Sequence, residues 1–141
     1  MLFRSYGSLI EAVAIVQPSS PLTLARDIDG TIDLLDQSGA ESAVSVVQVD
    51  HAIHPAKLKV MQGDRLLPYL EAEGERMAEF QLPRVYVRNC AVYVSRRAVI
   101  ESGKILGDDC RGYEMPRERS VDINSPFDLE FARFLWARKH G

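Results

Sequence analysis

Several features that mark membrane, secreted or zinc-binding proteins are scarce in this sequence. Its 141 residues include only two cysteines, Cys90 and Cys110, and their spacing fits no metal-binding motif. No apolar run approaches the roughly 20 residues that a membrane-spanning helix needs, and residues 1–7 show no secretory signal. These absences predict a cytoplasmic protein with two buried, reduced thiols and no membrane partner.

An excess of positive charge is also missing. Seventeen lysines and arginines stand against 20 acidic residues, which gives a formal net charge of −3 and a sequence pI of about 5.6. A dedicated nucleic-acid binder usually carries a basic excess, so we expect no nucleic-acid partner. The net charge is compatible with binding of small anionic ligands, because a few arginines suffice to bind them. The hydrophobic content of 46% is that of an ordinary globular domain.

The first third of the sequence follows a strand–helix–strand order. Residues 11–17 are nearly all apolar and predict a strand buried on both faces of a parallel sheet. Thr23 can cap a helix that runs to about Ser38, where Gly39 is suited to end it. The β-branched stretch over residues 43–49 predicts a second strand. This order is typical of an α/β sheet.

The middle of the sequence is polar, with short apolar pieces over residues 51–84. The sequence Gln62-Gly63-Asp64 predicts a turn between residues 58–60 and 66–67. A hairpin arm and a loop excursion from the main sheet both fit this pattern.

Regular structure is expected again after residue 84. Two strands are predicted at residues 85–87 and 91–94, followed by a short helix over 96–102 that Gly103 ends. A final helix is predicted from its start signals, since Ser125 can cap it and proline suits its first position. Its predicted apolar stripe consists of Leu129, Ala132, Leu135 and Trp136.

Two short polar segments are candidate binding sites. Gln17, Ser19 and Ser20 follow a predicted strand, and ligands of open α/β sheets bind at the carboxyl ends of strands. Arg88 can grip a carboxylate with two parallel hydrogen bonds, and Asn89 can recognise hydroxyl groups. Taken alone, a rigid turn with locally bonded serines and an ordinary surface arginine explain both segments more simply.

A third candidate precedes the final helix. Arg117 and Arg119 alternate, and Asp122 and Asn124 alternate likewise, so that each pair would share one face of an extended segment. A carboxylate and an amide can contribute to a Mg²⁺ site together with phosphate oxygens and water. A salt-bridged strand that leads into a helix cap fits the spacing equally well.

The histidines give no further site. His51 and His54 are three residues apart and lie near Lys57 and Lys59, but no cysteine or third histidine stands at ligand spacing. We therefore expect a solvated basic loop there.

In this order, the segments resemble the acylneuraminate cytidylyltransferase (CMP-sialic acid synthetase) family. The resemblance covers most of the chain, from Gln17 to Trp136, and each piece is short. It rests on Gln17–Leu22, Ala43–Val49, His54-Pro55 with a nearby lysine, Leu82–Asn89 and Met115–Asp122.

The resemblance implies a three-layer, Rossmann-like α/β fold of the nucleotide-sugar transferase kind. The chain would represent its second half, so that residues 1–141 form one truncated cytidylyltransferase domain. An excursion at about residues 51–84 would serve for dimerisation, which makes a homodimer the expected assembly.

The resemblance also implies a reaction. A sialic-acid-like nonulosonate would attack the α-phosphate of CTP, releasing pyrophosphate and forming a CMP-sugar, with Mg²⁺ as cofactor. Asp122 would be catalytic and would hold the metal with Asn124. The substrate-binding residues would be Gln17, Ser19, Ser20, Lys59, Arg88, Asn89, Arg117 and Arg119, of which Lys59 and Arg88 can act across a dimer interface.

The sequence departs from the family pattern in three ways. Nothing before Gln17 resembles the glycine-rich loop that cradles the triphosphate. The metal motif reads Asp122-Ile123-Asn124 where the family has two aspartates, and Cys90 replaces a glycine. We therefore expect slow or no turnover by this chain alone.

Two other interpretations of the sequence fit the same observations. The first is a non-catalytic remnant or dimerising interaction module from a truncated reading frame. The second is a related transferase that uses an eight-carbon keto-sugar acid.

Overall fold

A computed structural model describes residues 10–70 and 82–140 of the chain. The chain divides into two compact units. The first unit comprises Met1–Val47 and Arg88–Gly141, and the second comprises Gln48–Val87. No described helix is both long and apolar enough to cross a bilayer.

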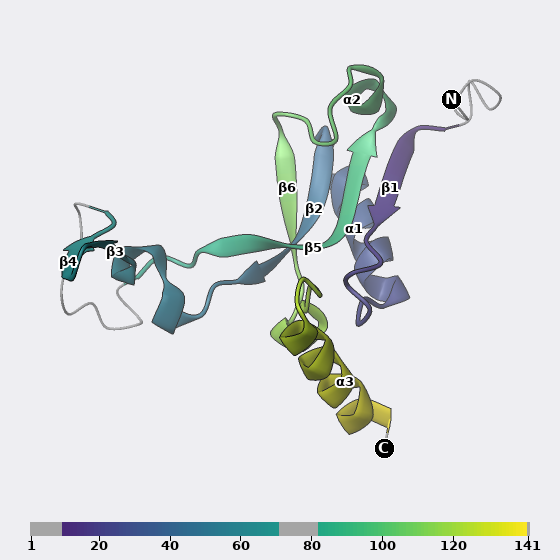
Figure 1. The fold of residues 1–141 in the computed structure, drawn as a ribbon. Helices are drawn as coiled ribbons and strands as arrows, with labels where there is room; N and C mark the ends of the chain where they lie inside the picture. Colours follow the sequence, from purple (N-terminus) through teal and green to yellow (C-terminus); the bar gives the residue numbers. More distant parts are fainter. Residues whose placement is uncertain (1–9, 71–81, 141) are drawn as a thin grey trace. The chain divides into compact units, whose positions relative to one another are not determined.

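A mixed four-stranded sheet forms the centre of the first unit (Figure 1). Its strands lie in the order β1 (Ala12–Val16), β5 (Tyr86–Arg96), β2 (Ser42–Gln48) and β6 (Cys110–Glu114). β1 runs antiparallel to β5, and β2 runs parallel to β6. The strand–helix–strand prediction is therefore confirmed.

The predicted burial of the first strand on both faces is wrong. β1 lies at the edge of the sheet beside an antiparallel neighbour, and its Val16 is 45% exposed. An apolar run alone does not reveal a strand's position in the sheet, because that position depends on partners distant in sequence.

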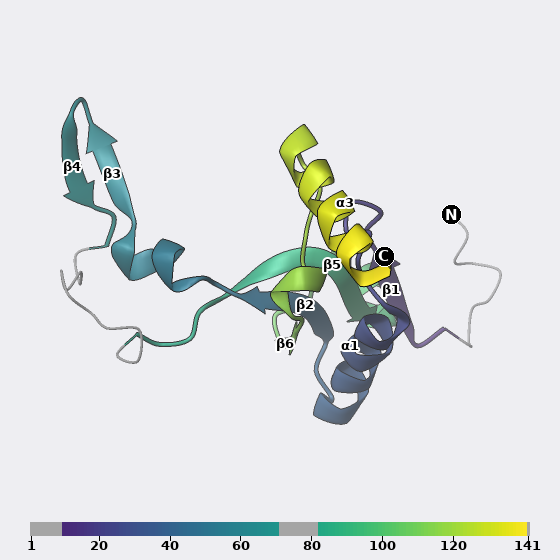
Figure 2. The ribbon, with the colours of Figure 1, turned by 90° about the horizontal axis from the view of Figure 1, so that it is seen from below.

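The helix α1 (Ala25–Ser38) packs against the sheet and contacts β1 and β6 (Figure 2). Its Leu35 is fully buried. The core cluster consists of Leu35, Ala40, Ala43, Ala91, Val92, Val94 and Met115.

The predicted end of α1 is confirmed, because Gly39 has a left-handed φ of 66° there. Its start differs from the prediction. The Thr23 hydroxyl donates to the Ser20 carbonyl, while the Asp27 carboxylate accepts from the Leu24 amide at 2.9 Å and so caps the first turn.

β5 is one continuous strand where the sequence predicts two. The break predicted between residues 87 and 91 is a local distortion, in which Cys90 has a φ of 58°. A non-glycine residue in this region is uncommon, and a single one can kink a strand without ending it. The expected burial of both cysteines is wrong, because Cys90 is half-buried and Cys110 is exposed.

The two later helices lie where the sequence predicts them. The short helix α2 (Arg97–Glu101) is followed by Gly103 with a φ of 84°. The helix α3 (Pro126–His140) begins directly after Ser125, whose hydroxyl oxygen accepts from the Asp128 amide at 3.3 Å.

Two expectations about the end of the first unit are wrong. Residues Arg117–Arg119 form a 3₁₀ turn, so the two arginines do not share one face of an extended segment. In the predicted stripe of α3 only Ala132 is buried, whereas Trp136 is 55% exposed. Pattern alone predicts an apolar face but not what covers it.

The second unit has two 3₁₀ turns, His51–Ile53 and Pro55–Lys57. A hairpin of β3 (Lys59–Gln62) and β4 (Arg65–Pro68) follows. The predicted turn at Gly63-Asp64 is confirmed. A role of this unit in dimerisation stays a prediction, and residues 71–81 lie outside the described part of the chain.

Candidate functional site

A hollow of about 440 Å³ in the first unit brings together two of the predicted substrate-binding residues. Gln17 follows β1, and Arg88 lies near the start of β5. The remaining lining residues are Ile15, Tyr93, Ile105 and Leu106. The lining therefore combines apolar walls with an amide, a phenol and a single charged side chain, Arg88.

The electrostatics of the hollow favour a neutral phenol beside a cation. Burial raises the pKa of Tyr93 to about 12, and a hydrogen bond with the Cys90 side chain adds to this shift. Arg88 acts in the opposite direction, whereas the negative charge of Asp122 raises the pKa further. Tyr93 is therefore a hydrogen-bond donor at neutral pH, and Asp122 lies within electrostatic range of it.

Asn89, predicted to bind substrate, is buried and already engaged. Its Oδ1 accepts from Ser45 Oγ at 2.6 Å, and its Nδ2 donates to Ser120 Oγ at 2.8 Å. Oδ1 also lies 3.4 Å from the Ala91 amide, and Nδ2 lies 3.3 Å from Met115 Sδ. These contacts join β2, β5 and the segment before Asp122. The Asn89 side chain thereby stabilises the position of the backbone next to Arg88 through hydrogen bonds inside the unit.

The two serines of the loop after β1 connect the same segments. Ser20 is 3% exposed, and its hydroxyl donates to the Cys90 carbonyl at 3.3 Å. The Ser19 carbonyl accepts from the Ile123 amide at 2.8 Å. Gln17 is held by its own backbone amide, which donates to the Ala91 carbonyl at 3.0 Å. The loop thus fixes the position of Gln17 relative to Asp122.

Arg119, also predicted to bind substrate, is paired inside the unit. Its Nε and Nη2 donate to the two carboxylate oxygens of Asp27 at 2.9 and 2.7 Å. Asp27 is fully buried, and burial by itself would raise the pKa of its carboxyl group. The hydrogen bonds from Arg119 and from the Leu24 amide outweigh burial, so the pKa is lowered. Arg117, two residues earlier, is exposed.

Asp122 and Asn124 contact each other, as their alternation suggests. Asn124 Nδ2 donates to Asp122 Oδ2 at 2.8 Å, and Asp122 Oδ1 is buried without a hydrogen-bond partner. A buried carboxylate oxygen without a partner is costly. A cation fits such an oxygen, and Mg²⁺ accepts one carboxylate together with ligand oxygens and water. The described residues contain no cluster of three or more acidic, cysteine or histidine side chains at metal-binding distance.

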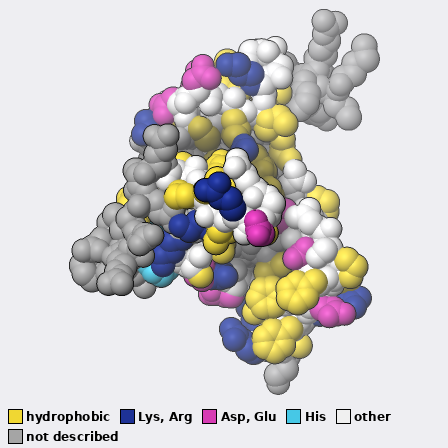
Figure 3. Space-filling model, turned by 60° about the vertical axis from the view of Figure 1, so that its left-hand side comes forward, with side chains coloured by type: hydrophobic (Ala, Val, Ile, Leu, Met, Phe, Trp, Pro, Cys, Tyr) yellow, Lys and Arg dark blue, Asp and Glu magenta, His cyan; other side chains and the backbone are white. Residues whose placement is uncertain are grey.

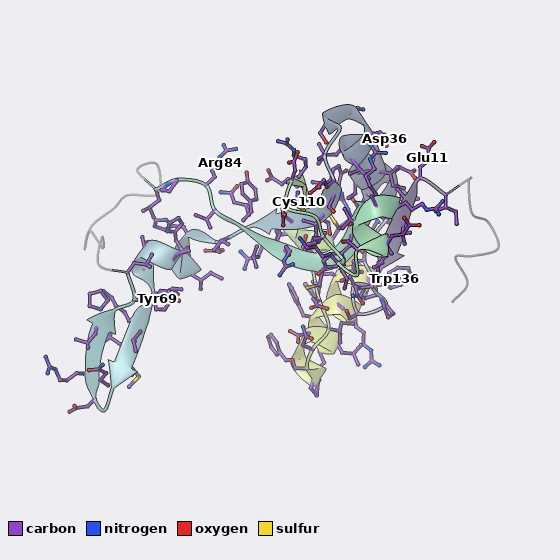
Figure 4. All side chains as sticks on the ribbon, turned by 90° about the horizontal axis from the view of Figure 1, so that it is seen from above. Glu11, Asp36, Tyr69, Arg84, Cys110 and Trp136 are labelled. Carbon is purple, nitrogen blue, oxygen red and sulfur yellow. The ribbon has the colours of Figure 1, made fainter. Side chains whose placement is uncertain are left out.

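The second unit holds the remaining predicted residues. Lys59 is exposed on β3. A hollow of about 650 Å³ is lined mainly by residues 48–51 and 82–85, and Arg84 projects from the segment before β5 (Figure 4).

The expectation of a solvated loop is wrong for one of the two histidines. His54 is 7% exposed, its Nδ1 accepts from the Ala56 amide, and its Nε2 lies 3.1 Å from the Pro83 carbonyl. His51 contacts Lys57.

Tyr93 is the site residue that sequence reasoning missed. It stands within an apolar strand pattern, where an aromatic residue signals the core. Its pairing opposite Ile15 gives it a place in the hollow, and that pairing is not encoded locally.

Comparison with known proteins identifies the class of fold. No protein-family model matches the sequence. The structure resembles that of CMP:2-keto-3-deoxy-manno-octonic acid synthetase complexed with CTP, with a TM-score of 0.59 and 17% sequence identity. The similarity covers 92% of this chain and 63% of that one.

The chain therefore has a mixed α/β fold of the nucleotidyltransferase kind, and the predicted fold class is confirmed. It spans less than two thirds of the length of the synthetase that it resembles.

Proposed function

We propose that the chain is part of a cytidylyltransferase that activates a sialic-acid-like nonulosonate with CTP. The observation that carries this proposal is the hollow in which Gln17, Arg88 and Tyr93 converge, with the free oxygen of Asp122 in the same neighbourhood. The fold supports it, because the synthetase that the chain resembles was solved with CTP.

The lining suits a sugar acid. The Arg88 guanidinium would hold the carboxylate with two hydrogen bonds, since its planar donors match carboxylate geometry. Gln17 can both donate to and accept from sugar hydroxyls. Tyr93 keeps its proton and would donate, and Ile15 and Ile105 would cover the apolar parts of the ring.

The reaction would be a nucleotidyl transfer. The anomeric hydroxyl of the sugar acid attacks the α-phosphorus of CTP, the bond to the β-phosphate oxygen breaks, pyrophosphate leaves and the hydroxyl proton is released. Asp122 and the Asn124 amide oxygen would hold Mg²⁺, which neutralises phosphate charge when bound. Arg117 is an exposed cation near this segment that suits a phosphate. In this proposal the enzyme is a homodimer to which Lys59 contributes across the interface.

Binding of the sugar acid tests the recognition step by itself. We expect saturation-transfer NMR to detect N-acetylneuraminate on the purified chain, and we expect Arg88→Ala or Gln17→Ala to remove the signal. Arg97→Ala is the matched control, because Arg97 is a half-exposed arginine that pairs with Glu101 on α2 and does not line the hollow. Equal signals from the Arg88 and Arg97 variants would contradict the proposed pocket.

The choice of sugar acid can be tested with the same protein. Pyrophosphate release with CTP and Mg²⁺ is compared for N-acetylneuraminate and for the eight-carbon keto-sugar acid. Faster release with N-acetylneuraminate supports the nonulosonate, whereas faster release with the eight-carbon acid assigns the alternative substrate.

A non-catalytic interaction module is the second candidate function. It is favoured by the internal engagement of Asn89, Arg119 and Ser20, which are three of the residues expected to bind substrate. Absence of sugar-acid binding and of pyrophosphate release, in a protein that is folded by circular dichroism, would favour this alternative.

A further inference from the structure

The final helix α3 exposes large apolar side chains on much of its circumference. Among its residues Phe127 is 75% exposed, Phe134 60% and Phe131 44%. Figure 3 shows hydrophobic side chains gathered over α3 at the lower end of the first unit. Neighbouring large apolar side chains that are exposed in this way often mark an interaction surface.

One side of α3 faces its own unit. Ala132 is 4% exposed. A hollow of about 390 Å³ lies between α3 and the loop before α1, and its lining from α3 consists of Leu135, Trp136, Arg138 and Lys139. Figure 4 shows Trp136 on α3.

The three phenylalanines form a different side, which we call the phenylalanine stripe. Their spacing of i, i+4 and i+7 places them within an arc of about 60° on an α-helix.

The charges of α3 are distributed unequally along its length. Acidic Asp128 and Glu130 lie in its first half, Arg133 lies at its midpoint, and Arg138 and Lys139 lie in its second half. Two such helices packed in opposite directions therefore place acidic residues opposite basic ones, and their dipoles oppose each other favourably as well.

We propose that the phenylalanine stripe is an interface on which α3 of a second copy of this chain packs antiparallel. A twofold contact requires the same surface on both copies, and a stripe of aromatic rings is self-complementary in this sense. Aligning Phe131 of one copy with Phe134 of the other brings Arg138 beside Phe127 and Glu130 of the partner helix. Arg138 can then contact a ring face and a carboxylate at once.

The size of the stripe predicts a weak dimer. A fully exposed phenylalanine presents about 200 Å², so the stripe offers roughly 350 Å² per copy. This area is typical of the largest apolar patch on a monomer. It is less than half of the roughly 800 Å² that each partner buries in a standard protein–protein interface. We therefore expect association that depends on protein concentration in the micromolar range.

Sedimentation equilibrium of the full chain tests the interface. We expect Phe131→Ser with Phe134→Ser to weaken self-association at least tenfold. Ile105→Ser is the control, because Ile105 is 59% exposed and lies outside both α3 and the second unit. A monomeric wild-type chain at every concentration, or an equal loss of association in the Ile105 variant, would overturn the proposal.

A charge reversal separates self-pairing from binding of any other apolar partner. Glu130→Arg and Arg138→Glu should each weaken association several-fold, and the double variant should restore it. Restoration requires that Glu130 of one copy meets Arg138 of another. If the double variant stays as weak as the single ones, the antiparallel pairing is wrong, and circular dichroism checks that each variant remains folded.

Discussion

The pair formed by Asp27 and Arg119 joins two distant parts of the first unit. Asp27 caps the first turn of α1 through the Leu24 amide and receives two hydrogen bonds from Arg119. Arg119 lies in the turn that leads to Asp122. One carboxylate thus satisfies a helix start and fixes the segment that carries the candidate metal ligand.

Replacing Asp27 with asparagine should destabilise the fold. The variant leaves Arg119 without a counter-charge in a site where it is largely buried, and breaking such a pair costs about 3 kcal/mol of unfolding free energy. Urea unfolding measures the loss. Asp36→Asn is the control, since Asp36 pairs with Arg96 at the surface and its removal should cost under about 1 kcal/mol.

The Asp27 carboxylate should also make the unfolding free energy depend on pH. The pKa of Asp27 is lower in the folded chain than its usual value, so its contribution is present above the unfolded pKa of about 3.9 and is lost as the pH falls through the folded value. The difference in unfolding free energy between wild type and Asp27→Asn should therefore be constant from pH 7 to 5 and shrink below pH 4. A constant difference down to pH 2 would contradict this assignment.

Cys90 offers a spectroscopic test of the hollow. Cys90→Gly should be tolerated, because glycine adopts the positive φ without strain. It should lower the pKa of Tyr93, since the hydrogen bond with the Cys90 side chain helps to raise that pKa to about 12. Ultraviolet titration of the tyrosines measures the change, and Cys110→Ser should leave the curve as it is.

At the scale of elements, local sequence signals predict where helices and turns begin and end. Gly39, Gly103 and Ser125 stand where the structure has helix ends and starts. The continuity of β5 and the edge position of β1 could not be predicted, because both depend on pairing between distant segments. For the site, the family resemblance implied roles for Gln17, Arg88 and Asn89. Only the fold reveals that the Asn89 side chain is engaged in hydrogen bonds within the unit.

The packing of α1 on β6 predicts an unusual effect of a glycine substitution. Alanine normally stabilises a helix by about 1 kcal/mol relative to glycine. At Gly30 the added Cβ would overlap the Tyr113 ring and lie 2.8 Å from its hydroxyl oxygen. Gly30→Ala should therefore lower the unfolding free energy in wild type. In a Tyr113→Leu background the same change should raise it, and thermal unfolding of the four proteins measures the reversal.

At the scale of the whole molecule, the few charged groups at the candidate site limit the turnover that the proposed function predicts for this chain. The chain covers 63% of the synthetase that it resembles in fold. Among the described residues, the candidate site has the cations Arg88 and Arg117 and one buried oxygen of Asp122 without a hydrogen-bond partner. A triphosphate is usually cradled by several backbone amides and cations. We therefore predict that the chain alone releases pyrophosphate from CTP at least a hundredfold more slowly than a typical transferase rate of about 10 s⁻¹. Rapid release in a coupled phosphate assay would contradict this prediction.

The shared amide of Asn89 has a consequence for local motion. Because one side chain bonds both β2 and the segment before Asp122 while lying on β5, none of the three can open without breaking contacts of the others. Their backbone amides should exchange with deuterium as one cooperative group, on one timescale. In Asn89→Ala that group should divide, and the segment before Asp122 should exchange first.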